Sequence, residues 1–244
     1  MKKYILIGIL GLISVALKAQ NAFNYQELGI GLNASYVRGY TNVTRQYNHP
    51  AFDIAILYNY NPYLPIAVEF QKGTLSGGGL TVKLDKYGRQ YSNNYSAISL
   101  HADIQLGAGI DYEDNNFLKF VKNFYIGTGI GILSNDNTVQ RTNVIVANGP
   151  LNYVFPGTDK GTNIVLPIRF GYEIKIFDSY REPTMAIGIG YVHNMTFGEG
   201  LDGYNDPNAK FKNNALDQYR QIVVGFKYFF GNVVSYNKPL RKYR

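Results

Sequence analysis

The chain lacks cysteine and tryptophan altogether, and only 17% of its 244 residues are charged, against about 25% in an average soluble protein. Without cysteine it can form no disulfide framework, thiolate zinc site or cysteine nucleophile. After residue 20 there is also no apolar run near the ~20 residues that a membrane-spanning helix needs. These absences exclude thiol chemistry and helical membrane proteins.

The net charge of +7 belongs to the two ends of the chain and not to its body. Three cations without acids lie near the start, Lys2, Lys3 and Lys18. Four more lie in the last residues, Lys238, Arg241, Lys242 and Arg244, again without acids. The remaining chain is neutral, so it offers no basic face for nucleic acid, which such binding requires.

The first twenty residues, MKKYILIGILGLISVALKAQ, have the three parts of a secretory signal. Two lysines are followed by an apolar stretch from Ile5 to Leu17 and by the small Ala19. We therefore expect a signal peptide over residues 1–19. The ending Lys-Ala-Gln is similar to that of signal peptides in the Gram-negative group that uses type IX secretion.

Strict alternation of apolar and polar residues dominates the sequence after Gln20. From Ala97 to Asp111 every second residue is apolar, and the others are mostly small or polar. This period of two predicts β-strands, and a length above ~9–11 residues suffices to cross a bilayer at a tilt. The same pattern predicts eight strands, centred on residues 28–36, 52–60, 66–71, 97–111, 124–132, 164–174, 185–192 and 222–230.

The connections between these strands alternate in length. The long ones cover residues 39–50, 74–95, 134–161 and 198–217, and they are rich in Asn, Asp, Gly, Thr and Tyr. An even number of strands with short turns at one end and long loops at the other is typical of outer-membrane barrels. We predict an all-β fold, a transmembrane eight-stranded antiparallel up-and-down β-barrel over residues 20–230.

The large apolar residues should face lipid, because eight strands enclose room for little more than one layer of side chains. Tyr58, Tyr60 and Tyr63 near one turn fit an aromatic girdle at the membrane interface. The opposite faces then line the lumen. Their charged members are Asp53, Glu69, His101, Asp103, Arg169, Glu173 and Lys227.

Charges buried together in a narrow lumen must pair, since an unpaired buried charge is costly. We expect these residues to form a salt-bridged plug that closes the barrel. A narrow path for a solute is the alternative. The glycines at 127, 129, 131, 188 and 190 lie inside strands, and we expect them to make room in the lumen and not to bind a dinucleotide, which needs a strand-to-helix turn.

The last strand contains Gly225, Tyr228 and Phe230 in a pattern that resembles the signal read by the barrel-assembly machinery. Residues 231–244 follow it, and we expect them to form a short basic tail in the periplasm. Between the fourth and fifth strands, residues 114–122 (DNNFLKFVK) predict a turn or two of amphipathic helix. This segment is expected either to pack on the barrel rim or to anchor at the interface and contact a partner.

Three histidines are the only acid–base candidates at neutral pH, and His193 is the one placed near the outer rim. The position resembles that of the His-x-Ser-Asn motif in outer-membrane lipid A deacylases. Here Met195 stands where that motif has serine, so no nucleophile is present. We predict no catalytic residue, no cofactor and no metal site, the last because no ligand spacing suggests one.

The layout resembles the small outer-membrane barrels of the OmpA/OmpX-like type. Residues 190–197 and 201–204 also resemble the penultimate strand and loop of the barrel associated with type IX secretion. That resemblance implies a non-catalytic accessory of a periplasmic secretion complex. Two functions stay open: a structural or accessory barrel with both termini in the periplasm, whose partners are lipid, the assembly machinery and a periplasmic protein, or a lipid-modifying enzyme.

Overall fold

The computed structural model describes residues 24–113, 115–143, 145, 153–205 and 216–236. The predicted signal peptide at residues 1–19 lies outside this part of the chain, as do residues 237–244 of the predicted tail. Among the described residues, no helix combines the length and the hydropathy needed to cross a membrane.

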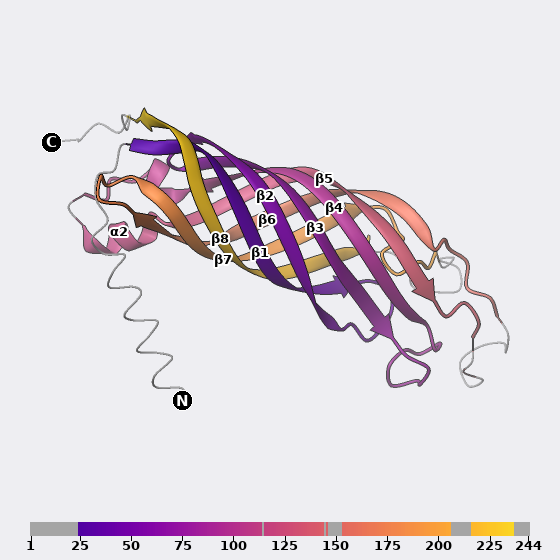
Figure 1. The fold of residues 1–244 in the computed structure, drawn as a ribbon. Helices are drawn as coiled ribbons and strands as arrows, with labels where there is room; N and C mark the ends of the chain where they lie inside the picture. Colours follow the sequence, from indigo (N-terminus) through magenta and orange to yellow (C-terminus); the bar gives the residue numbers. More distant parts are fainter. Residues whose placement is uncertain (1–23, 114, 144, 146–152, 206–215, 237–244) are drawn as a thin grey trace.

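Eight strands and a short helix make up the described structure (Figure 1). The strands are β1 (Asn24–Tyr40), β2 (Asn48–Asn61), β3 (Leu64–Gly78), β4 (Gln90–Gln105), β5 (Phe124–Val139), β6 (Lys160–Phe177), β7 (Pro183–Phe197) and β8 (Gln218–Ser235). Helix α2 (Asn116–Val121) and a 3₁₀ turn (Leu106–Ala108) lie between β4 and β5.

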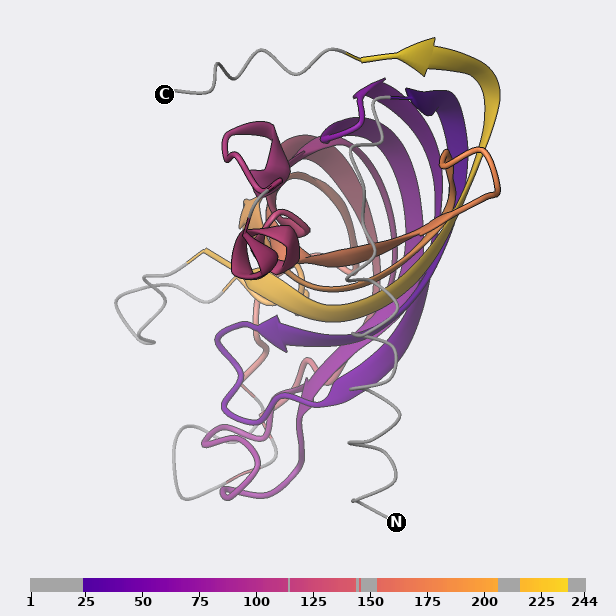
Figure 2. The ribbon, with the colours of Figure 1, turned by 90° about the vertical axis from the view of Figure 1, so that its left-hand side faces the viewer.

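Each strand pairs antiparallel with the next one, and β8 pairs with β1 to close the barrel. The closing register runs from Asn24 opposite Ser235 to Tyr40 opposite Gln218. Closure pairs the backbone of every strand and leaves no sheet edge, as a span through lipid requires. Figure 2 shows the ring of strands from the end that carries α2. The predicted eight-stranded antiparallel fold is confirmed.

The alternation in the sequence separates the outside of the barrel from the inside. On β2, Ile54 and Ile56 are 53% and 67% exposed, whereas their neighbours Asp53 and Leu57 are 5% and 2% exposed. The same contrast recurs on all eight strands and leaves a continuous belt of Ile, Leu, Val, Phe and Tyr on the outer surface. A belt of this extent belongs in lipid, because soluble monomers rarely expose large apolar patches.

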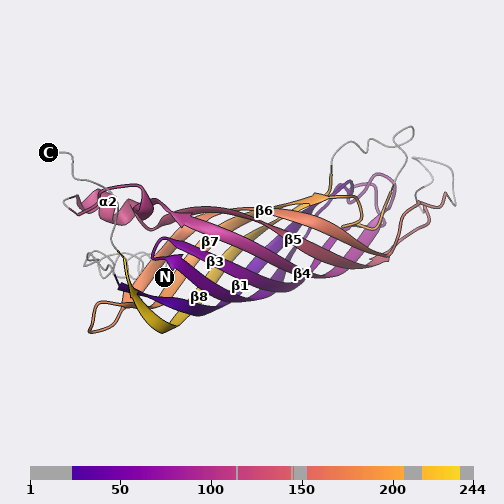
Figure 3. The same cartoon turned by 90° about the horizontal axis from the view of Figure 1, so that it is seen from above.

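The strands extend well beyond the apolar belt toward the long connections. Strand β4 begins at Gln90 and β5 continues to Val139, inside segments predicted to be loops. The true connections at this end cover only residues 41–47, 79–89, 140–159 and 198–217. Their described residues lie together at one end of the barrel, while α2 and the other turns lie at the opposite end (Figures 1 and 3).

Two strand ends illustrate how the structure differs from the sequence prediction. Strand β4 ends at Gln105 and not at Asp111, because the chain turns into the 3₁₀ helix there. Strand β8 runs on to Ser235 instead of ending at Phe230, and its last residues pair with the start of β1. The predicted amphipathic helix is present as α2, capped by the Asn115 side chain, which accepts hydrogen bonds from the first turn.

Candidate functional site: the lumen and the two ends of the barrel

The charged residues predicted for the lumen all lie inside the barrel, and one cation holds three strands together. The Arg169 guanidinium of β6 donates to the Asp103 carboxylate of β4 across 3.0 Å, and its Nη1 lies 3.6 Å from Glu69 Oε2 of β3. All three side chains are at most 10% exposed. The ion pairs therefore cross the lumen and fill its middle.

A second charged cluster lies nearer the α2 end. Lys227 of β8 donates to Glu173 of β6 across 2.5 Å, and the Gln105 amide donates to the other Glu173 oxygen across 2.9 Å. Lys175 extends the cluster by donating to the Pro62 carbonyl of the β2–β3 turn. Lys175 was missed from the sequence, although it lies in phase with Arg169 and Glu173 on the inward face of β6.

Two further lumen residues have incomplete hydrogen bonding. His101 Nε2 lies 4.0 Å from Asp103 Oδ2, and its Nδ1 is buried without a hydrogen-bond partner. Asp53 Oδ1 is likewise buried without one, and no ion pair of the described residues includes Asp53. The expected pairing of lumen charges thus holds for Arg169 and Lys227 but does not extend to Asp53.

Glycines on β5 make the room that this network needs. A Cβ on Gly127 would lie 2.0 Å from Asp103 Oδ1, and a Cβ on Gly129 would lie 2.6 Å from the His101 Cβ. On β7, a Cβ at Gly190 would meet the Tyr125 hydroxyl at 2.4 Å. These glycines make room for the lumen side chains, as the sequence predicts, whereas a Cβ at Gly188 would meet nothing closer than 3.5 Å.

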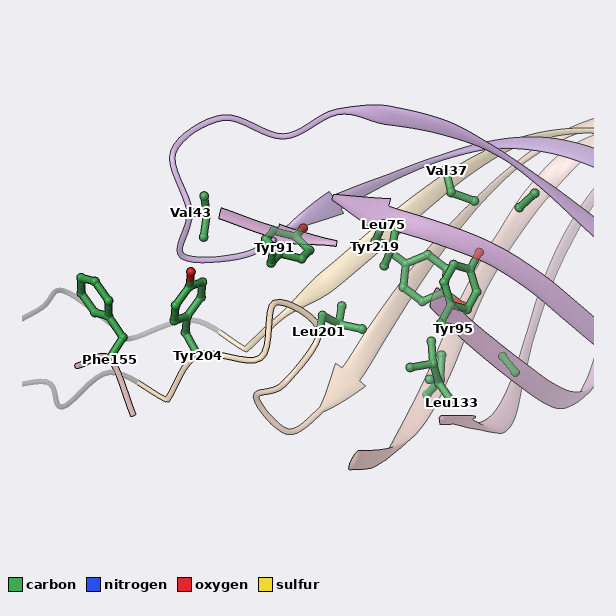
Figure 4. Close-up of a cluster of buried hydrophobic side chains, with 13 residues drawn as sticks. Val37, Val43, Leu75, Tyr91, Tyr95, Leu133, Phe155, Leu201, Tyr204 and Tyr219 are labelled. Atoms are coloured by element: carbon green, nitrogen blue, oxygen red, sulfur yellow. The ribbon is translucent and has the colours of Figure 1, made fainter. Parts of the chain in front are cut away.

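An apolar plug fills the lumen at the long-loop end, and Figure 4 shows its side chains. Tyr95 of β4 and Tyr219 of β8 face each other with ring centroids 5.4 Å apart, and both are almost completely buried. The Tyr219 hydroxyl donates to Gln71, which also bonds with Gln221 across the barrel. The other large members of the plug include Val37, Leu75, Tyr91, Leu133 and Leu201.

The loops above this plug are fixed in place by buried polar groups. Asp85 accepts hydrogen bonds from the backbone of Thr44 and from the backbone and side chain of Arg89. Burial alone would raise the pKa of the Asp85 carboxyl, but the hydrogen bonds and the charge of Arg89 outweigh it and lower that pKa. In the last loop, Asp217 accepts from the backbone of Gly200 and Leu201, both at 3.0 Å.

Small cavities lie between the described residues inside the barrel. One of about 40 Å³ lies among His101, Asp103 and Arg169, and two others have about 10 Å³ each. A water needs about 10–15 Å³, so these spaces hold a few water molecules and no larger solute. In the described part of the chain, no three His, Asp or Glu side chains gather in a way that could hold a metal ion.

His193 lies on the outer surface of β7 near the long-loop end. Its Nε2 is 2.7 Å from Gln218 Oε1, and its ring stacks on Tyr191. Its neighbour two positions on is Met195, so the position that holds serine in the His-x-Ser-Asn motif carries no hydroxyl here.

The predicted aromatic girdle needs one correction. Tyr58 and Tyr60 are exposed on the outer face, but Tyr63 is buried inside the turn, where its hydroxyl bonds with that of Tyr112. In the predicted assembly signal, Tyr228 and Phe230 point outward and stack on each other at 6.3 Å. Gly225 is on the inward phase, where a Cβ would lie 2.2 Å from Asn33 Oδ1.

No protein-family model matches the chain, and no curated protein matches its sequence. Among solved structures it is similar to Neisserial surface protein A, with 11% identity and a TM-score of 0.48 over 83% of this chain and 97% of that one. Ail of Yersinia pestis has 11% identity and a TM-score of 0.45 over 84% and 99% of the chains. The outer membrane protein OprG of Pseudomonas aeruginosa has 9% identity and a TM-score of 0.34 over 84% and 97%.

Proposed function

We propose that this chain is a non-catalytic outer-membrane β-barrel with a sealed lumen, which serves a structural or accessory role in the cell envelope. The observation that carries the proposal is the double closure of the lumen. The ion pairs of Arg169 fill the middle of the barrel, and the plug around Tyr95 and Tyr219 fills its long-loop end.

The closure weighs against transport through the lumen. A solute path would have to separate Arg169 from Asp103 and Glu69, which would leave three buried charges uncompensated. Breaking a buried pair costs about 3–5 kcal/mol. It would also have to displace Tyr95 and Tyr219 from their mutual contact. Thermal motion does not open such a path often enough for steady conduction.

The orientation of the barrel follows from its connections. Outer-membrane barrels have short turns on the periplasmic side and long loops outside. With that orientation, the start of β1, the end of β8 and helix α2 face the periplasm. Two large apolar side chains are exposed at that end: Phe117 of α2 is 70% exposed and Tyr180 of the β6–β7 turn is 81% exposed. We infer that this end contacts a periplasmic protein, the arrangement expected of a secretion-apparatus accessory.

Planar-bilayer recording tests the sealed lumen. The wild-type chain should give no large, steady conductance steps. Replacing Tyr95 and Tyr219 together with alanine should raise the leak, whereas the outward Tyr58→Ala should not. Steady large steps from the wild-type protein would show that the lumen conducts and would refute the proposal.

A photo-crosslinking residue at Phe117 tests the partner surface in cells. It should crosslink to a periplasmic protein, while the same residue at the lipid-facing Ile56 should not. Equal crosslinking at both positions, or none at Phe117, would count against an accessory role. A truncation that tests the tail as a partner contact should remove only residues 237–244. Residues 233–235 must stay, because they pair with β1 in the barrel wall.

A further inference from the structure

Two arginines face each other on the outer surface of the closing seam. Arg38 of β1 and Arg220 of β8 are direct register partners. His193 of β7 is the next residue in the same row, opposite Arg220. All three side chains are half-buried and lie on the outward phase of their strands.

This arrangement is electrostatically unfavourable as it stands. Like charges directly opposite each other on neighbouring strands destabilise a sheet. None of the ion pairs among the described residues includes Arg38 or Arg220. The Arg38 Nε is moreover buried without a hydrogen-bond partner. An anion between the two guanidinium groups would remove the repulsion and accept the unused hydrogen bonds.

The position of Arg38, Arg220 and His193 along the barrel axis indicates which kind of anion binds there. The next row toward the apolar belt holds Tyr36, Ile222 and Tyr191, and beyond the arginines only Tyr40 and Gln218 precede the long loops. The arginines therefore lie at the edge of the apolar belt, where lipid headgroups begin. The Arg220 guanidinium lies 5.7 Å from the centre of the Tyr40 ring, which holds it in this plane.

We propose that Arg38 and Arg220 together bind the phosphate group of a membrane lipid in the leaflet at the long-loop end. Arginine suits this role because its planar set of N–H donors fits phosphate oxygens in a bidentate way. The fatty chains of that lipid lie against the apolar row below. The inference rests on the membrane-spanning belt and depends on neither the sealed lumen nor a protein partner.

Lipid binding in nanodiscs tests the proposal. The wild-type chain is placed in phosphatidylcholine nanodiscs with lipid A, with lipid A stripped of its phosphates, or with neither, and retained lipid is measured by native mass spectrometry. We expect selective retention of phosphorylated lipid A. Arg38→Gln and Arg220→Gln should each weaken it about tenfold or more, the loss expected for a hydrogen bond to a charged group. Lys72→Gln, which removes an exposed outward cation of β3, should leave it unchanged.

Stability separates binding from a purely structural role. In phosphatidylcholine alone, Arg220→Gln should be at least as stable as wild type, because it removes a repulsion. With phosphorylated lipid A the wild type should gain stability that the variant does not. The proposal would be overturned if Lys72→Gln weakened lipid A retention as much as the arginine variants do, or if Arg220→Gln destabilised the barrel equally in both lipids. Full displacement of lipid A by millimolar inorganic phosphate would also overturn it, because it would show a site for free phosphate.

Discussion

Removing the central cation of the lumen should destabilise the barrel far more than removing a surface cation. Arg169 is 9% exposed and contacts two carboxylates, Asp103 at 3.0 Å and Glu69 at 3.6 Å. The Arg169→Met variant keeps much of the side-chain volume but leaves both carboxylates buried without a cation. Breaking a buried ion pair in this way costs about 3–5 kcal/mol.

The matched control is the exposed pair between Lys160 and Asp136 at the rim. Its atoms are 3.8 Å apart, and the two side chains are 78% and 63% exposed. Surface pairs of this kind contribute about 0–1 kcal/mol, so Lys160→Met should be nearly neutral. The assay is reversible urea unfolding in lipid vesicles, followed by the mobility of the folded barrel on cold gels.

The triple variant Glu69→Gln, Asp103→Asn, Arg169→Met makes the test specific. It removes the carboxylate charges together with the cation, so it should recover most of the free energy lost by Arg169→Met alone. If Arg169→Met costs under about 1 kcal/mol, or if the triple variant recovers nothing, the lumen charges do not stabilise the barrel as argued here.

Three further predictions follow from the packing of the lumen, the loops and the rim. Gly127→Ala should destabilise the barrel by about 1–3 kcal/mol, because its Cβ would overlap Asp103, whereas Gly161→Ala meets nothing within 4 Å and should be neutral in the same unfolding assay; similar effects at both positions would contradict the packing argument. Since the Asp85 carboxyl has a lowered pKa, its contribution is complete above the ordinary value of about 3.9 and should disappear as the pH falls through the lowered pKa. The protection of the amides of residues 79–89, measured relative to their intrinsic exchange rates at the same pH, should therefore be high at pH 7 and low in strong acid, with Asp85→Asn already weakly protected at pH 7; equal protection in that variant would refute this reasoning. Finally, His193→Ala should leave the lipid A profile of cells unchanged by mass spectrometry, because Met195 replaces the serine of the deacylase motif, and a change in acyl chain number would reveal an enzyme.

The sequence predicts the strands because alternation is strong wherever one face meets lipid. It understates their length because the outward residues become polar above the apolar belt. On β4 the outward positions Ser92 and Asn94 read as a loop, yet they pair with β5 in an unbroken register. Pairing of the backbone continues where the hydrophobic signal has ended.

The sequence predicts which charged residues line the lumen but not which of them contact one another. Alternation places Arg169, Asp103 and Glu69 on inward faces, but which carboxylate meets the guanidinium depends on the register of three strands. The plug was missed because Tyr91 and Tyr95 lie in a segment that reads as a loop. One signal in the sequence was available. Side chains of this size at inward-facing positions would block an open lumen, so they indicate a closed one.

Accessibility of single-cysteine variants tests the central claim most directly, and the natural absence of cysteine makes each labelled position unambiguous. Spin labels are placed one at a time along residues 53–58 of β2 in lipid vesicles, and collisions with oxygen and with a water-soluble nickel complex are measured. If the apolar belt faces lipid and the lumen is sealed, oxygen access should be high at 54, 56 and 58, and access to both reagents should be low at 53, 55 and 57. Nickel access at the second set would show an open aqueous lumen, and loss of the alternation would show that the apolar belt does not face lipid.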